Sequence, residues 1–131
     1  MKKLVIATAL GLCFALPALA DPVDGAWKTQ PGAEGKFVIV QIAACGDKVC
    51  GTMAKLLGPD GKQIISPNVG KKMIWDMVAK GNGVYEDGRI WAPDKDKTYN
   101  SHMQLSGDTL AVSGCVWGGL ICRSQRWTRV K

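Results

Sequence analysis

The sequence predicts an all-β protein, an antiparallel up-and-down β-barrel with one short helix. Short segments rich in β-branched and aromatic residues recur along the chain, and Gly, Pro, Asn and Asp residues separate them. Several segments alternate apolar and polar side chains, which is typical of strands with one buried face. Seven or so such strands fit a sandwich or a barrel. A barrel is favoured because the last segment, 120–130, can close against the first, which carries Trp27.

The elements are expected in the following order. The predicted strands are 24–30, 36–44, 51–57, 88–92, 97–105, 109–117 and 120–130. A loop rich in Gly and Pro is expected at 58–70. Two interpretations fit 71–80: apolar residues between Met73 and Val78 have helical spacing, whereas Met73, Trp75 and Met77 alternate as in a strand. We favour a short helix that ends at Gly81 and packs across one end of the barrel.

The first twenty residues have the pattern of a cleavable signal peptide. Two lysines precede an apolar run, residues 4–16, which is too short to span a bilayer. Residues 18–20 read Ala-Leu-Ala, a small-x-small cleavage motif. We therefore expect an exported mature chain, residues 21–131, that forms a single domain and does not span the membrane. Cys13 leaves a lipoprotein as an alternative, but the leucine before it is larger than the residues found at lipidation sites.

Four cysteines remain after the signal peptide, and an even number in an exported chain indicates two disulfides. Two sequence-local pairs each bracket a turn, so we predict the bridges Cys45–Cys50 and Cys115–Cys122. With a four-residue loop between them, Cys45 and Cys50 would lie opposite each other. Each bridge would add about 2–2.5 kcal/mol to the free energy of unfolding. Zinc bound by the same cysteines is the alternative, but their spacing is poor for zinc and the compartment is oxidising.

Charge and motifs exclude several classes of function. The net charge of +6 falls to +4 without the two lysines of the signal peptide, which favours anionic neighbours but also fits ordinary solubility. The basic residues form no run, so nucleic acid is not expected as a partner. Catalysis is not indicated either, because no nucleophile motif is present and the one histidine, His102, lies on the polar face of its strand. Without an acidic cluster, no metal site or cofactor is expected.

A ligand cavity inside the barrel is the function that we expect. The predicted ligand-binding residues share the inward faces of two strands and are Tyr99, Ser101, Met103, Arg123 and Gln125. Aromatic surface with one cation suits a small apolar or amphipathic ligand with an acidic head. An interior filled by side chains is the other interpretation. The alternative function is then a protein-binding module, a hydrolase inhibitor or envelope assembly factor, that uses the loops 58–70 and 81–88.

Six motifs in order cover nearly all of the mature chain. They are Gly25-x-Trp27, Cys45…Cys50-Gly51, Gly88-x-Ile90-Trp91-x-Pro93, Lys97-Thr98-Tyr99, Leu110-x-Val112-x-Gly114 and Gln125-x-Trp127-Thr128-Arg129-Val130. Together they resemble the DUF2147 family of small exported bacterial proteins. The resemblance implies a lipocalin-like barrel in the periplasm, from a family with no established biochemical function. Many relatives carry Asp-x-x-Asn-Pro where this chain has residues 65–69, Ile-Ser-Pro-Asn-Val, so no role of that cluster is transferred.

Barrels of the lipocalin type close with a Trp on the first strand and an Arg near the end of the last. In this chain, the matching residues are Trp27 and Arg129. A guanidinium laid on a buried indole adds a cation–π attraction of about 1–2 kcal/mol. We therefore expect these two residues to have a structural role and do not count them among the ligand-binding residues.

Overall fold

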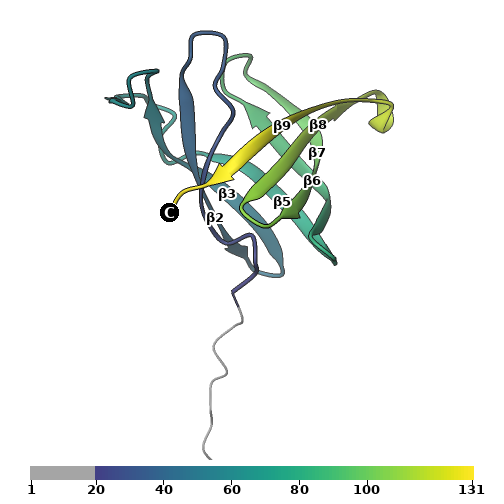
Figure 1. Cartoon of the computed structure of the whole chain (residues 1–131). Helices are drawn as coiled ribbons and strands as arrows, with labels where there is room; N and C mark the ends of the chain where they lie inside the picture. Colours follow the sequence, from purple (N-terminus) through teal and green to yellow (C-terminus); the bar gives the residue numbers. More distant parts are fainter. Residues whose placement is uncertain (1–19) are drawn as a thin grey trace, which may run out of the picture.

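The computed structural model describes residues 20–131, so the predicted signal peptide, apart from Ala20, lies outside the described residues. The described residues form one antiparallel sheet that curls into a barrel (Figure 1). The strands are β1 (Gly25–Lys28), β2 (Phe37–Cys45), β3 (Lys48–Leu57), β4 (Gln63–Ile64), β5 (Lys72–Gly81), β6 (Val84–Ala92), β7 (Lys97–Ser106), β8 (Thr109–Val116) and β9 (Ile121–Arg129). A short 3-10 turn, η1 (Trp117–Gly119), connects β8 to β9.

Eight of the strands make the barrel, and their order is up-and-down because each pairs with its neighbour in the sequence. The two-residue strand β4 only extends the edge of β3. The barrel closes between β1 and β9, where Trp27 lies opposite Arg129. The predicted antiparallel up-and-down barrel is therefore confirmed. Among residues 20–131, no helix has the length and apolar composition that crossing a bilayer would require.

The predicted helix at 71–80 is wrong, because these residues form strand β5. Ile74 and Met77 are both buried although they are three residues apart, since the β3–β5 register shifts between their partners and Asp76 adopts φ = 59°. A bulge inserts one residue and so changes which side chains face inward. The resulting spacing is the one that a helix face would show. Gly88 of β6 accommodates the bulge, because a Cβ there would overlap the Met77 thioether.

The two ends of the barrel carry different connections. At one end, short turns join β2 to β3, β5 to β6 and β7 to β8, and the chain enters β1 and leaves β9 there. At the other end lie the connections 29–36, 58–71, 93–96 and 117–120, which are longer or more exposed. We call these the closed end and the open end. Figure 1 shows the connections 29–36, 58–71 and 93–96 toward the top, the connection 117–120 at the upper right and the chain entering from below.

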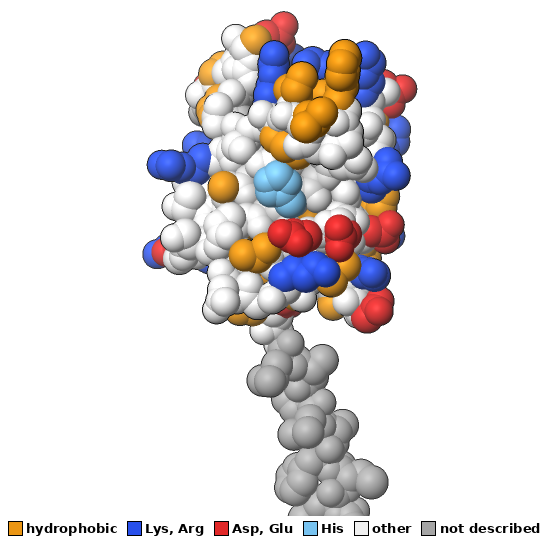
Figure 2. All heavy atoms as spheres, turned by 90° about the vertical axis from the view of Figure 1, so that its right-hand side faces the viewer, with side chains coloured by type: hydrophobic (Ala, Val, Ile, Leu, Met, Phe, Trp, Pro, Cys, Tyr) orange, Lys and Arg blue, Asp and Glu red, His pale blue; other side chains and the backbone are white. Residues whose placement is uncertain are grey.

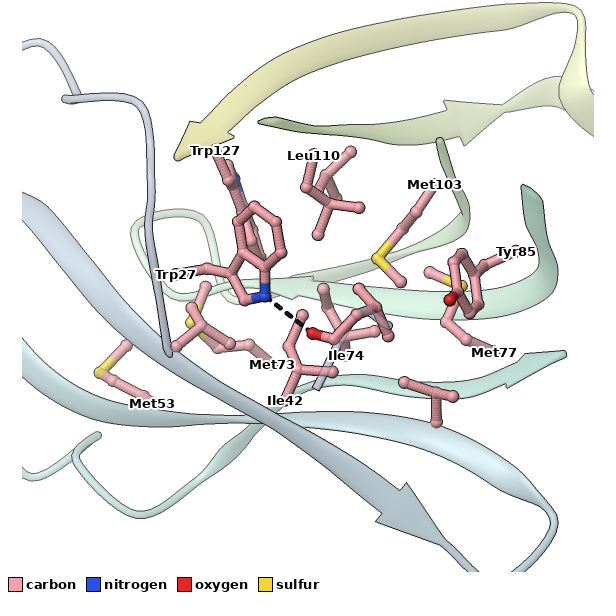
Figure 3. Packing of buried hydrophobic residues seen from close by; sticks show 14 residues of the cluster. Trp27, Ile42, Met53, Met73, Ile74, Met77, Tyr85, Met103, Leu110 and Trp127 are labelled. Carbon is pink, nitrogen blue, oxygen red and sulfur yellow. Dashed lines mark hydrogen bonds between the residues drawn. The ribbon is translucent and has the colours of Figure 1, made fainter. Parts of the chain in front are cut away.

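Most of the hydrophobic core lies toward the closed end of the barrel. Trp27 is fully buried and Trp127 is 1% exposed, and Figure 3 shows both among aliphatic and sulfur-containing side chains. All four methionines after Met1 are buried in this core; they are Met53, Met73, Met77 and Met103. Methionine is flexible and fills irregular gaps, so it suits the changes of register in the bulged strands.

Arg129 seals the closed end. Its guanidinium lies 4.4 Å from the Trp27 ring, which confirms the expected closure contact. The guanidinium also donates to the backbone oxygens of Pro22 at 2.8 Å and Asp24 at 3.0 Å and pairs with Asp108 at 3.1 Å. One side chain thus holds the first strand, the last strand and the segment that precedes the barrel.

Both predicted disulfides are present. Cys115 and Cys122 are directly opposite each other on β8 and β9, with their Cα atoms 4.1 Å apart. The second bridge, Cys45–Cys50, has a Cα separation of 5.7 Å and joins residues that are diagonal neighbours. The expected direct opposition of Cys45 and Cys50 is wrong, because the turn contains only two residues and pairs Cys45 with Lys48.

Candidate ligand-binding cavity

A cavity of about 400 Å³ lies toward the open end of the barrel, between strands β6, β7, β8 and β9. Its walls combine aliphatic and aromatic surface with two cations, one carboxylate and one amide. The lining residues are Ile90, Ala92, Asp94, Lys95, Tyr99, Val112, Gly114, Val116, Ile121, Arg123 and Gln125. Clefts of about 300–1,000 Å³ with mostly apolar walls and a few polar groups are the usual sites for small molecules.

The pairing of β8 with β9 explains why there is space at this end. Arg123 lies opposite Gly114, and Gln125 lies opposite Val112. Because Gly114 has no side chain, the wall beside Arg123 is backbone. A Cβ at position 114 would lie 3.5 Å from Ile90 and 3.6 Å from Tyr99, which are ordinary contact distances. The glycine therefore leaves space in the cavity without being required by a clash.

Arg123 is the polar group best placed to bind a ligand. Its side chain lines the cavity and is exposed, and within residues 20–131 it makes no ion pair. Gln125 is oriented by its side-chain oxygen, which accepts a hydrogen bond from the indole nitrogen of Trp127 at 3.1 Å. That bond leaves the amide nitrogen as a donor. The cavity thus offers a guanidinium and an amide donor on neighbouring inward positions of one strand.

Three of the five predicted ligand-binding residues come together at the cavity: Tyr99, Arg123 and Gln125. Ser101 and Met103 do not line it. Ser101 is buried and donates a hydrogen bond to the backbone oxygen of Ser113 at 2.7 Å, and Met103 is 1% exposed in the core. Contact with a ligand remains a prediction for the three cavity residues.

Sequence reasoning missed three parts of the lining. One is the inward face of β8 with the first residue of β9, which alternation would have identified: Val112, Gly114, Val116 and Ile121. Ile90 and Ala92 come from β6, where alternation from the buried Gly88 would have identified them as inward-facing. Asp94 and Lys95 belong to the β6–β7 turn, where carboxylates and lysines are ordinary, so composition carried no signal for them. Residues 84–88, which the protein-binding alternative treats as loop, lie within β6.

The single histidine lies outside the barrel and away from this cavity. His102 is exposed, and its Nδ1 is 3.7 Å from the sulfur of Cys115. Together with Cys122 these residues are the one cluster of metal-ligand type in the described part of the chain. Both sulfurs are bonded to each other, so the thiolates that a zinc site needs are not present.

The barrel and its cavity define a protein of lipocalin-like architecture. Residues 25–129 match the family described as uncharacterized protein conserved in bacteria (DUF2147), and the chain belongs to this family. Among solved structures, protein HP1028 from Helicobacter pylori, described as belonging to the lipocalin family, superposes with a TM-score of 0.68 at 16% identity over 82% of each chain. This likeness shows that the two share a fold and confirms the expected lipocalin-like barrel. No curated protein matches the sequence.

Proposed function

We propose that the mature protein is a periplasmic binding protein without catalytic activity, whose cavity holds a small amphipathic acid. The observation that supports this proposal best is an Arg123 side chain without an ion-pair partner in the described chain, beside an otherwise largely apolar cavity of about 400 Å³. Small barrels can hold one ligand of this size class. In the proposed complex, Arg123 meets the acid and Tyr99 lies beside the apolar tail.

The lining gives each part of such a ligand a matching surface. A charge-assisted hydrogen bond from a guanidinium to a carboxylate contributes about 1.5–3 kcal/mol. Ile90, Val116 and Ile121 supply aliphatic surface for a hydrocarbon tail. The amide nitrogen of Gln125 can donate to a second oxygen of the acid. Lys95 and Asp94 at the rim offset each other, so Arg123 supplies the net positive charge of the lining.

Two further observations support the class and the compartment. The cavity lining includes no histidine, serine or cysteine beside its other titratable residues, Asp94, Lys95 and Tyr99, so it has no His-paired nucleophile. Two disulfides form in this chain, and disulfides persist in oxidising compartments such as the periplasm. The predicted signal peptide supports the same location.

A titration with a fluorescent fatty-acid probe tests the proposal, with tryptophan as the energy donor. Arg123→Gln should weaken probe binding by about ten- to a hundredfold, because it removes the charged contact. Arg126→Gln is the matched control. Arg126 lies on the same strand but on the outward face, opposite Ala111, so its loss should leave the probe affinity unchanged.

A second variant fills the cavity. The Cβ of Gly114→Leu would make ordinary contacts with Ile90 and Tyr99, and the rest of the leucine side chain would occupy part of the cavity. We expect this variant to exclude the probe and to keep the melting temperature of the wild type. Absence of saturable binding by the wild type, or equal losses in the Arg123 and Arg126 variants, would contradict the proposed function.

A further inference from the structure

The β8–β9 hairpin ends in an exposed apolar tip, residues 117–121. Trp117 is 78% exposed, Leu120 is 84% exposed and Ile121 is 54% exposed. In Figure 1 the tip projects to the right of the barrel, and Figure 2 shows hydrophobic side chains gathered on that face between Lys and Arg side chains. Contiguous apolar surface at one point of a soluble protein usually marks a contact with a partner or a membrane.

The backbone of the tip keeps its tryptophan in an unfavourable conformation. Trp117 has φ = 58°, a region that bulky residues rarely adopt, although the next residue is a glycine. Strain of this kind persists where the surroundings impose it and is concentrated at functional positions. Because Trp117 gains no burial from its position, the strain is not offset by packing in the core. The disulfide Cys115–Cys122 clamps the two strands directly below the tip, so the apolar residues are presented on a braced projection.

The apolar surface of the tip continues into the cavity. Ile121 belongs to both, because it is more than half exposed and also lines the cavity. Val116, its partner across the hairpin, lines the cavity as well. The connection beyond this pair, residues 117–120, consists of the exposed Trp117 and Leu120 with two glycines between them. A hydrocarbon chain that moves along the hairpin would therefore meet apolar side chains from the tip to the interior of the barrel.

We propose that the tip inserts into the head-group region of an anionic lipid bilayer, so that an amphipathic acid can pass between the bilayer and the cavity. The inference rests on the proposed function and names the source of its ligand. Tryptophan and leucine on a small projection suit the boundary between head groups and acyl chains. Arg123 and Arg126 follow the tip along β9, residues 109–126 contain no acidic residue, and Figure 2 shows Lys and Arg side chains beside the hydrophobic group, which complements a negatively charged surface.

Vesicle flotation of the mature chain tests the proposal. The wild type should bind vesicles of phosphatidylglycerol mixed with phosphatidylcholine, bind phosphatidylcholine alone more weakly, and be released from the anionic vesicles by salt. The double variant Trp117→Ser with Leu120→Ser should partition less by about tenfold or more, because it removes two exposed apolar side chains. Val130→Ser is the control, since it removes an apolar side chain that is 44% exposed beyond the other end of β9.

The outcomes separate this inference from the proposed function. Failure of the wild type to bind anionic vesicles would overturn it, and so would equal losses in the tip variant and Val130→Ser. Self-association that the tip variant abolishes, without vesicle binding, would assign the tip to a second copy of the chain and also overturn it. Probe titration of the wild type in vesicle-free buffer reports on the cavity alone. Probe binding without vesicle binding removes only the docking proposal. Vesicle binding without probe binding removes the proposed function and the transfer of a ligand, and leaves only the docking of the tip.

Discussion

Strand β9 carries three arginines, and the two on its inward face, Arg123 and Arg129, have different surroundings because they lie at opposite ends of the barrel. At the closed end, the Arg129 side chain is 24% exposed, stacks on Trp27 and contacts three oxygen acceptors. Near the open end, Arg123 faces a cavity and has no ion-pair partner in the described chain. Both arginines belong to β9, and because an even number of residues separates them, their side chains lie on the same face of the strand. The difference shows that position along the barrel axis, rather than face, decides whether an inward arginine is structural or available to a ligand.

The packing follows the same division. The closed half contains the two most deeply buried tryptophans, whereas the cavity lies toward the open end. Burial of apolar surface is the dominant favourable contribution to folding, so most of the stability is expected to come from the closed half. The open half can then keep a cavity and an exposed apolar tip at little cost to the fold. The predictions below test this division from the largest expected effect to the smallest.

Two tryptophan substitutions should give the largest contrast. Trp27→Ala should lower the free energy of unfolding by about 3–5 kcal/mol, because it removes a fully buried side chain and leaves Arg129 without its aromatic partner. Trp117→Ala removes an equally large side chain that is 78% exposed, and it should change stability by less than about 0.5 kcal/mol. Urea unfolding of both variants measures the difference. Similar losses at the two positions would contradict the division.

The sequence predicted the C-terminal half of the fold well and failed at 71–80, for a physical reason. In β7, β8 and β9 the alternation is unbroken, and the β7–β8 and β8–β9 registers contain no bulge, so inward and outward residues could be assigned directly. In β5 the register shifts against both neighbouring strands, and the buried pair Ile74 and Met77 acquires the spacing of a helix face. Bulges depend on how neighbouring strands pair. A single strand read in isolation therefore cannot reveal them.

The candidate site divides in the same way. Alternation placed Tyr99, Arg123 and Gln125 on inward faces, and these residues do meet at the cavity. The same alternation placed Ser101 and Met103 on an inward face. Alternation does not show, however, how far along the barrel axis the packed core extends, and these two residues lie within that core. That boundary depends on where large side chains from all the strands meet. The rim residues Asp94 and Lys95 come from a turn, where no periodicity exists to predict their direction.

A pair of arginine substitutions sharpens the comparison within β9. Arg129→Ala should lower the free energy of unfolding by about 2–3 kcal/mol, since it removes the cation–π contact and charged hydrogen bonds. Arg123→Ala should change it by less than about 0.5 kcal/mol, because no partner is lost. A double-mutant cycle between Arg129→Ala and Trp27→Leu isolates the stacking contribution. A coupling energy of zero would show that the two side chains do not stabilise each other.

The smallest expected effect concerns Tyr85, which ties the N-terminal segment to the closed end. Its side chain is 3% exposed, and its hydroxyl donates to the carboxylate of Asp21. Burial raises the pKa of Tyr85 well above its usual range, and the hydrogen bond to Asp21 raises the pKa further. The folded state therefore holds this proton more tightly than the unfolded state does. The stability that results is fully present below the ordinary tyrosine pKa of about 10 and is lost as the pH rises above it.

Tyr85→Phe should consequently have opposite effects in two pH ranges. At pH 7 it should cost about 1 kcal/mol, because the hydrogen bond to Asp21 is lost. Above about pH 10 the wild type should lose stability more steeply than the variant, whose phenylalanine has no proton to release. Tyr99→Phe provides the comparison at the open end, since its hydroxyl makes no hydrogen bond within residues 20–131 and its loss should leave the stability at pH 7 unchanged. Urea midpoints measured from pH 7 to pH 11 test both statements. Parallel alkaline profiles of the wild type and Tyr85→Phe would show that Tyr85 does not fasten the closed end through its protonated hydroxyl.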